Sequence, residues 1–358
     1  MATLKEIKGQ KIQSLDSDPV EYVGTWSSGG TANTARNNLF GVGESTTSAL
    51  IYGGESPYYA QTEQYNGSSW TEVADLNEAR QNGGSIGTTT SAGAVSGQAP
   101  PPSSSVNFEQ WNGSAWTETA NVNAGRQQAA GAGTNTAGLF FGGYAYPTPG
   151  ITNINESWNG SAWTEVGDLN TARYLQGGGG TNTAAICCGG DTPGVTANTE
   201  TWNGTSWTEV SNLNTARKNL SEGAGVYDDF LTMGGNTGSI TNIVEQWNGS
   251  AWTEVADLAS NIQAGSSSGT TTSAIQAAGY NGTARVGTTQ EFSFPPSTSS
   301  ILTEGRLWFN TASSSLKGYG KAAGIPTGTW SSGGSLNVAR SALTAAGTTY
   351  TNSIAMQG

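Results

Sequence analysis

The sequence predicts an all-β protein, a six-bladed β-propeller closed by an N-terminal strand. Three observations predict it: two aromatic series with one period, a Gly doublet and an Asn-Gly turn in most repeats, and no amphipathic helical stretch between Val23 and Phe294. A period in the forties that combines Gly doublets, Trp and Thr is typical of propeller blades rather than of helical solenoids. Because one four-stranded blade has too small an apolar face to be stable alone, the blades must stack on one another.

The two aromatic series define the ends of the fold. The first is Tyr65, Trp111, Trp158, Trp202, Trp247 and Phe292, and the second is Trp26, Trp70, Trp116, Trp163, Trp207 and Trp252. Each first-series residue except Phe292 lies five residues before a second-series Trp, whereas Trp26 has no aromatic partner before it. We therefore expect the strand that contains Trp26 to pair with the strand that contains Phe292 and to complete the sixth blade.

One repeat, residues 169–210, shows the expected order of strands in a blade. Arg173 opens the innermost strand, "TNTAAICCGG" forms the second, and "NTETW" and "SWTEV" flank the turn at Asn203. Asn-Gly between two aromatic, β-branched runs is a strong signal for a tight hairpin with positive φ at its central residues. The same turn recurs at Asn66, Asn112, Asn159 and Asn248.

These repeats resemble those of Kelch propellers. The resemblance rests on a Gly doublet after an apolar strand, followed by two spaced aromatics, and it covers residues 24–294 with a tighter aromatic spacing than the usual Kelch repeat. Repeats such as "WNGSAWTEVGDLNTAR" also look like those of propeller-bearing virion proteins of marine tailed phages, especially cyanophages. This second resemblance implies a structural or adhesive role on a virus particle.

The pattern divides the chain into four segments. They are an N-terminal arm (1–22), the propeller (23–294), a connector with a β-hairpin (295–327) and a partial first blade of a second propeller (328–358). The connector "GRLWFNTASSSLKGYG" resembles small hairpin modules of phage fibre and tail proteins. The last segment aligns without a gap on residues 24–54. Because a lone half-blade exposes strand edges, we expect it to belong to a second propeller in a longer parent protein or to dock on another subunit.

Composition argues against several classes of function. The net charge is −12 and the basic residues are dispersed, so a nucleic-acid partner is not expected. The chain has no histidine, the commonest general base and zinc ligand, so we expect no catalytic residues, no metal and no cofactor. No apolar run has the length of a membrane span, and the N-terminus lacks the apolar region of a Sec-type signal peptide. We therefore expect synthesis in the host cytoplasm and assembly into a virion.

A third series consists of charged residues. Its members are Arg36, Arg80, Arg126, Arg173 and Arg217, matched by Glu72, Glu118, Glu165, Glu209 and Glu254. One interpretation is an arginine cluster that binds a carboxylate or sialic acid. The other is repeated bonding of Arg to Glu or to the backbone, which holds the ring together. Symmetry favours the second, because a catalytic site on a propeller needs unlike residues from unlike blades.

Two further features have a functional and a structural interpretation. The repeated Trp residues form either a sugar-stacking surface or blade-to-blade packing, and fixed strand positions favour packing. Cys187 and Cys188 form either a redox or soft-metal pair or apolar filler. Filler is favoured, because adjacent side chains on a strand point to opposite faces.

The connections between the second and third strands differ most between repeats. They contain Tyr58, Tyr59, Tyr144, Tyr146 and Tyr280. We expect these loops on one face of the ring, together with the inter-blade turns. Tyrosines on a rigid scaffold suit recognition, although packing on loop prolines or on neighbouring subunits explains them equally well.

Three classes of function remain. The favoured one is a non-enzymatic virion component (fibre, whisker or decoration protein) that binds copies of itself, other virion subunits, or a host-surface glycan or protein. The alternatives are a carbohydrate-active propeller enzyme, such as a sialidase or oxidase, and a cellular Kelch-type adaptor.

Overall fold

A computed structural model describes residues 13–16, 18–19, 23–55, 57–100, 103–146, 150–295, 301, 307–318, 344–346 and 354–356. The chain forms two compact units, one of residues Gly24–Phe294 and one of Met1–Val23 with Pro295–Gly358. Each unit is built from β-strands, and no helix among the described residues is long and apolar enough to cross a bilayer.

The described residues of the larger unit form six four-stranded antiparallel sheets, numbered here in chain order. Sheets one to three are β3 (Phe40–Ser45), β4 (Ser48–Tyr52), β5 (Thr62–Tyr65), β6 (Trp70–Val73); β7 (Gly84–Thr88), β8 (Ser91–Val95), β11 (Phe108–Trp111), β12 (Trp116–Glu118); and β14 (Ala130–Thr134), β15 (Ala137–Phe141), β18 (Asn155–Trp158), β19 (Trp163–Glu165). Sheets four and five are β20 (Gly177–Gly180), β21 (Ala185–Cys188), β22 (Thr199–Trp202), β23 (Trp207–Val210); and β24 (Ala224–Val226), β25 (Asp229–Met233), β26 (Val244–Trp247), β27 (Trp252–Glu254).

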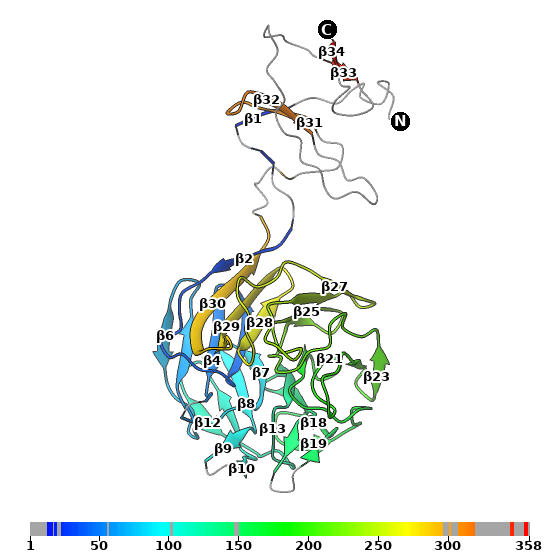
Figure 1. Cartoon of the computed structure of the whole chain (residues 1–358). Coiled ribbons are helices and arrows are strands. Elements are labelled where there is room, and N and C mark those ends of the chain that lie inside the picture. The colour runs from blue at the N-terminus through cyan, green and yellow to red at the C-terminus, as the bar shows by residue number, and fades with distance from the viewer. Residues whose placement is uncertain are drawn as a thin grey trace. The chain divides into compact units, whose positions relative to one another are not determined.

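The sixth sheet joins the two ends of this unit. It contains β28 (Ser266–Thr270), β29 (Ser273–Tyr280) and β30 (Arg285–Ser293), and its fourth strand is β2 (Thr25–Ser28). In Figure 1 the blue strand β2 lies beside the yellow β30, and the register places Trp26 opposite Phe292. Their ring centroids are 5.1 Å apart. The predicted pairing of these two strands is confirmed.

The first strands of the six sheets contact one another in a cycle. The contacts join β3 to β7, β7 to β14, β14 to β20, β20 to β24, β24 to β28 and β28 to β3. Small residues permit this approach: a Cβ added to Gly131 of β14 would lie 2.3 Å from the Ser85 carbonyl oxygen of β7.

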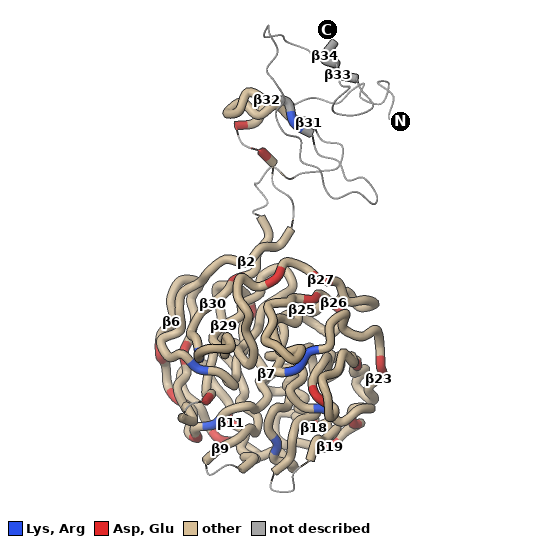
Figure 2. The backbone as a smooth tube through the Cα atoms, viewed as in Figure 1, with Lys and Arg blue, Asp and Glu red and all other residues tan. Residues whose placement is uncertain are grey.

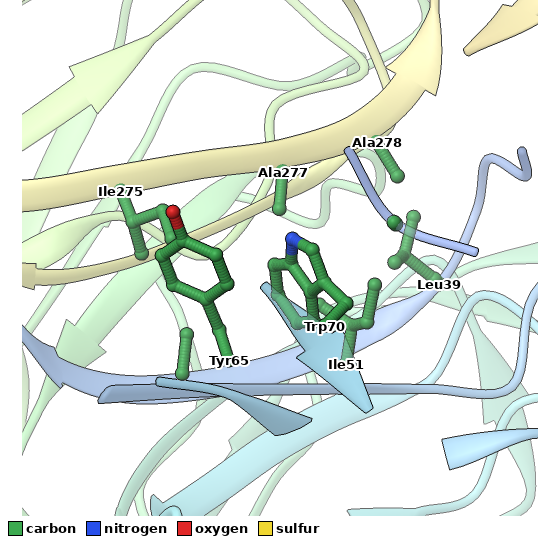
Figure 3. Close-up of a cluster of buried hydrophobic side chains, with 9 residues drawn as sticks. Leu39, Ile51, Tyr65, Trp70, Ile275, Ala277 and Ala278 are labelled. Carbon is green, nitrogen blue, oxygen red and sulfur yellow. The ribbon is translucent and has the colours of Figure 1, made fainter. Parts of the chain in front are cut away.

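The aromatic series lies where the third and fourth strands of each sheet meet. Five first-series residues lie opposite the second-series Trp of the same sheet, with ring centroids 4.8–5.6 Å apart, and Trp26 with Phe292 is the sixth pair. These rings are buried, apart from the partly buried Trp26. Figure 3 shows Tyr65 and Trp70 of sheet one packed against Ile275 and Ala277 of sheet six. This arrangement is the one that the packing interpretation requires.

The Asn-Gly turns differ from the tight hairpin that the sequence predicts. Four residues, starting with Asn66, separate Tyr65 from Trp70. Gly67 has φ +90°, whereas the Asn66 side chain accepts hydrogen bonds from the amides of Ser68 and Ser69 at 3.0 Å. One positive-φ residue and an Asn side chain, rather than two positive-φ residues, therefore make the turn, and the same bonds recur at Asn112, Asn159, Asn203 and Asn248.

A second correction concerns Arg173, which was expected to open the innermost strand of its repeat. That strand, β20, begins at Gly177. Arg173 instead lies in the segment that enters sheet four, where its side chain is fully buried. Short strands also form in the loops and entry segment around sheets two and three. They are β9 (Gln98–Ala99), β10 (Ser103–Ser104), β13 (Arg126–Gln127), β16 (Tyr144–Ala145) and β17 (Gly150–Ile151).

In the smaller unit the N-terminal arm pairs with the connector. Strand β1 (Gln13–Leu15) runs parallel to β31 (Leu307–Asn310), which pairs with β32 (Ser315–Gly318). The Asp18 carboxylate accepts hydrogen bonds from Lys317, Asn310 and Trp308, which lower its pKa to about 2. The N-terminal arm (1–22) and the connector (295–327), which the sequence pattern divides into separate segments, thus contribute strands to one sheet.

The predicted partial blade, 328–358, lies outside the described residues apart from β33 (Thr344–Ala346) and β34 (Ile354–Met356). These strands pair Thr344 with Met356 and Ala346 with Ile354. Positions 304 residues earlier are paired identically in sheet one, Phe40 with Tyr52 and Val42 with Leu50. The repeated sequence therefore repeats the first hairpin of a blade in the same register.

Candidate functional site

The variable loops lie at one end of the sheets, against the segments that enter the next sheet. In every sheet the glycine that ends the second-strand doublet, or its equivalent, donates a main-chain hydrogen bond of 2.7–3.0 Å to the next entry segment. The six bonds run from Gly54 to Arg80, Gly97 to Arg126, Gly143 to Arg173, Gly190 to Arg217, Gly235 to Ile262 and Gly279 to Arg36. We call this surface, formed by the second-to-third strand loops and the entry segments, the loop face.

The predicted tyrosines occupy separate places on the loop face. Tyr144 packs against Tyr174 of the next entry segment with tilted rings, whose centroids are 5.8 Å apart, and Tyr146 is 43% exposed. Tyr58 and Tyr59 are partly buried over sheet one.

Tyr280 ends β29, and its hydroxyl donates to the Gly282 carbonyl at 3.0 Å. In the same hairpin Arg285 pairs with Glu55 of sheet one at 3.5 Å and donates to Asn37 at 2.8 Å. The loops of sheets six and one are thus joined, whereas the exposed Tyr146 lies in the loop of sheet three.

A second ion pair lies on the loop face between sheets four and five. Lys218 contacts Asp191 at 2.7 Å. Burial acts to raise the pKa of Asp191, but hydrogen bonds from Lys218 and from the Gly194 amide outweigh it, and the pKa is lowered. This carboxylate is therefore ionised and held in place at neutral pH.

The arginine series is buried and pairs with different glutamates from those expected. Each Arg side chain is fully buried and contacts a Glu in the third strand of its own sheet at 2.5–3.2 Å. The pairs are Arg36–Glu63, Arg80–Glu109, Arg126–Glu156, Arg173–Glu200 and Arg217–Glu245. The predicted partners, Glu72, Glu118, Glu165, Glu209 and Glu254, are exposed on the fourth strands.

Each buried glutamate also fixes the entry segment of its sheet. Glu245, for example, accepts hydrogen bonds from the Asn214 amide at 2.7 Å and from the Thr215 amide at 3.2 Å. Burial lowers the pKa of Arg217, and the Glu245 carboxylate opposes that shift. Figure 2 shows the few Lys and Arg positions separated along the fold rather than gathered in one patch. The buried arginines are therefore not accessible to a ligand carboxylate.

The two cysteines are free, buried and directed to opposite sides of β21. Cys187 packs in a cluster with Leu139 and Phe141, and Cys188 packs in another with Phe230. Burial raises the pKa of both thiols, that of Cys188 to about 12. Because the thiolate is the reactive form, this geometry disfavours both redox exchange and metal binding.

A narrow cavity lies among the entry segments of all six sheets. Its volume is about 40 Å³, and its lining includes Asn38, Asn82, Gln128, Leu175, Asn219 and Ala264, all with φ between +51° and +60°. Main-chain hydrogen bonds of 2.5–3.3 Å link the segments in order, from Asn82 to Asn38, Gln128 to Asn82, Leu175 to Gln128, Leu220 to Leu175, Ala264 to Asn219 and Asn38 to Ala264. We call this space the axial cavity.

Two residues of these regions were missed by sequence reasoning. Tyr174 directly follows Arg173, at a position that is not aromatic in the other repeats. Glu222 lines the axial cavity at a place where the other repeats have Gly or Ser, and this deviation was the available signal. Among the described residues, no three His, Cys, Asp or Glu side chains lie close enough together to hold a metal.

No protein-family model and no curated protein matches this chain. Its function is therefore inferred from its residues and their geometry.

Proposed function

We propose that residues 23–294 form a closed six-bladed, Kelch-like propeller that acts as a non-enzymatic attachment protein of a tailed-phage virion. Three cyclic features support closure: the contacts of the first strands, the main-chain bonds around the axial cavity, and the bonds from each glycine to the next entry segment. Each cycle returns from sheet six to sheet one, and β2 supplies the fourth strand of sheet six.

The contrast between a repeated framework and variable loops is the observation that supports a role in attachment. Buried Arg–Glu pairs and aromatic pairs recur from sheet to sheet, whereas the second-to-third strand loops differ in sequence and structure. The loop face therefore carries sheet-specific chemistry over a repeated framework, which is the arrangement of a recognition surface. The phage setting rests on the resemblance of the repeats to virion propellers.

The same geometry counts against the alternative of a sialidase-like enzyme. An arginine cluster for a substrate carboxylate requires accessible guanidinium groups, and the series arginines are fully buried and paired. A Kelch-type adaptor would use a similar loop face, so the partner distinguishes it from a virion protein.

Adsorption competition tests the proposal. The purified chain, added in excess, should slow adsorption of a phage that carries this protein to its host cells, and antibodies against the chain should label intact virions. The double substitution Tyr144→Ala, Tyr146→Ala should abolish the competition.

Tyr227→Ala is the matched control. Tyr227 is 40% exposed, close to the 43% of Tyr146, but lies in the β24–β25 turn at the opposite end of the sheets. Its substitution should leave competition unchanged. Absence of the chain from purified virions, or equal competition by the loop-face variant, would overturn the proposal.

A further inference from the structure

One position of the loop face carries unlike side chains on a constant main chain. It directly follows the glycine that donates to the next entry segment, and in sheets one to six it is occupied by Glu55, Gln98, Tyr144, Asp191, Asn236 and Tyr280. The glycine makes the same main-chain bond in every sheet. The side chain after it is therefore not fixed by the architecture of the ring.

Each of these residues lies opposite a residue of the entry segment of its own sheet. The partners, in the same order, are Asn37, Gln81, Gln127, Tyr174, Lys218 and Gln263. Residues opposite each other in an antiparallel pair direct their side chains to the same face. Every partner also directly precedes a residue that lines the axial cavity. The six pairs therefore surround the axial cavity on the loop face, and we call them the paired ring.

Side chains of neighbouring pairs contact one another around the paired ring. The contacts are Tyr144 to Tyr174 with ring centroids 5.8 Å apart, Lys218 to Asp191 at 2.7 Å and Asn236 to Gln263 at 2.9 Å. They join sheets three to four, four to five and five to six. Side chains that are held in place before a ligand arrives lower the entropic cost of binding.

The chemistry of the paired ring is that of amides and tyrosines, without an aliphatic side chain. Its members are partly exposed, apart from the buried Gln81 and Asp191. An amide offers donors and an acceptor in one group, and a tyrosine offers an apolar ring face beside a hydroxyl. Gln98 Oε1 accepts from Gln81 Nε2 at 2.8 Å, and the Gln98 side-chain N–H groups form no bond among the described residues. They remain as donors for a ligand.

The charges of the paired ring are balanced. Lys218 compensates Asp191, and Arg285, beside the ring, pairs with Glu55 at 3.5 Å. An acidic ligand is favoured by an excess of positive charge and a basic ligand by an excess of negative charge. The paired ring has neither, so a neutral polar ligand matches it best.

We propose that the paired ring binds a neutral glycan of the host surface. The C–H faces of a sugar are apolar and pack on tyrosine rings, and each hydroxyl both donates to and accepts from an amide. A protein interface typically has an apolar core, for which the ring offers no aliphatic side chain. This inference rests on the proposed attachment function and names the class of receptor.

The glycan would lie across the paired ring rather than inside the axial cavity. The cavity volume of about 40 Å³ has room for only about one or two waters. A chain of sugars on the ring would contact several sheets at once, so unlike sheets could each select a part of it.

Binding of the labelled chain to host cells tests the class of receptor. Periodate, which cleaves the vicinal diols of sugars, should abolish the binding, whereas treatment of the cells with proteinase K should leave it intact. Polysaccharide extracted from the same cells and immobilised should also bind the chain. Its affinity should change by less than about twofold between about 0.05 and 0.5 M NaCl, because a neutral ligand has no charge for salt to screen.

Variants of the paired ring test its location. Tyr174→Ala should weaken binding to the immobilised polysaccharide roughly tenfold or more, as loss of a tyrosine anchor does. Tyr174→Phe should retain most of the affinity, because the ring face remains. Gln127→Ala, on the neighbouring pair, should also weaken binding and provides the test if Tyr174→Ala does not fold. Tyr227→Ala is the matched control, since Tyr227 is exposed at the opposite end of the sheets, and it should bind like the unmodified chain.

The outcomes separate the glycan from the attachment function. Cell binding that proteinase K abolishes and periodate spares would overturn the glycan and leave attachment standing, with a protein as the receptor. Affinity that falls steeply with salt would overturn the neutral class, and affinity unchanged in Tyr174→Ala and Gln127→Ala would overturn the site. Periodate-sensitive binding by a chain that is absent from virions would support the glycan site and overturn the virion role. A chain that does not bind the cells would overturn both.

Discussion

Substitutions in the buried Arg217–Glu245 pair test whether such pairs hold each entry segment on its sheet. Arg217 donates to the carbonyls of Gly234 and Ile243 at 2.9 and 2.7 Å and to Glu245 at 3.0 Å. Arg217→Ile would leave a fully buried carboxylate without its counter-charge. Removing one partner of such a pair costs about 3–5 kcal/mol, and we expect that loss here.

Sheet six contains the natural counterpart of a double substitution. Ile262 stands in place of the arginine and Gln290 in place of the glutamate, and the Gln290 side chain still accepts the entry-segment amide of Ala259 at 2.7 Å. Glu245→Gln alone should also cost about 3–5 kcal/mol, because it leaves Arg217 buried and unpaired. The double variant Arg217→Ile, Glu245→Gln should cost less than the sum of the two by about 2 kcal/mol.

Chemical denaturation of the intact chain, followed by Trp fluorescence, measures these losses. Each single substitution should also lower the melting temperature by roughly 10 °C for a unit of this size. Glu55→Gln is the control, because the Arg285–Glu55 pair is exposed and such pairs contribute at most about 1 kcal/mol. Additive single effects, or single effects as small as that of Glu55→Gln, would refute the reasoning.

Three further predictions concern the axial cavity, the closing strand and the cysteines. The folded chain retains the Glu222 proton between its ordinary pKa of 4.5 and about 7, so the stability measured by chemical denaturation should fall as pH rises through this window, by at most about 3 kcal/mol. Tyr52, which lies nearby, stays protonated because burial raises its pKa, so a Glu222→Gln chain with the same slope would show that Glu222 is not the titrating group. Deletion of residues 1–30 removes β2 and should cause aggregation or proteolysis. Deletion of residues 1–19 retains β2 and is the control. Cooperative melting of the 1–30 deletion at the melting temperature of the unmodified chain would count against closure. Ellman's reagent should label Cys187 and Cys188 only after denaturation, and labelling of the native chain faster than it unfolds would show that the thiols are accessible.

The repeated part of the fold was predictable because each repeat reports the same constraint. Five aromatic pairs with one spacing placed the third and fourth strands of five sheets, and the unpaired Trp26 and Phe292 identified the strands that meet. The glutamate partners were not predictable from spacing. Glu63 and Glu72 belong to series with the same period and lie opposite each other in β5 and β6, so their side chains share one face of the sheet. Glu63 is buried on the third strand, whereas Glu72 is exposed on the outermost strand.

Features that occur once were predicted least well. Strand β1 is short and polar, and its partner β31 lies almost 300 residues away, so no local pattern joins them. Glu222 is visible as a deviation only after the repeats are aligned on the arginines, and its contact with Ser85 depends on the arrangement of the sheets around the cavity.

The pairing of strands at the two ends of the larger unit has a mechanical consequence. In β2 and β30, Thr25 lies opposite Ser293, so tension on the flanking chain would peel their hydrogen bonds apart one at a time. In the parallel pair β1 and β31, Gln13 lies opposite Trp308, so the same tension would load all the bonds together in shear. Shear resists force better than peeling, and we expect single-molecule pulling on the chain ends to rupture the small sheet before the closing strand. The β1–β31 pair would thus protect the β2–β30 pair from tension on the chain ends until the small sheet ruptures.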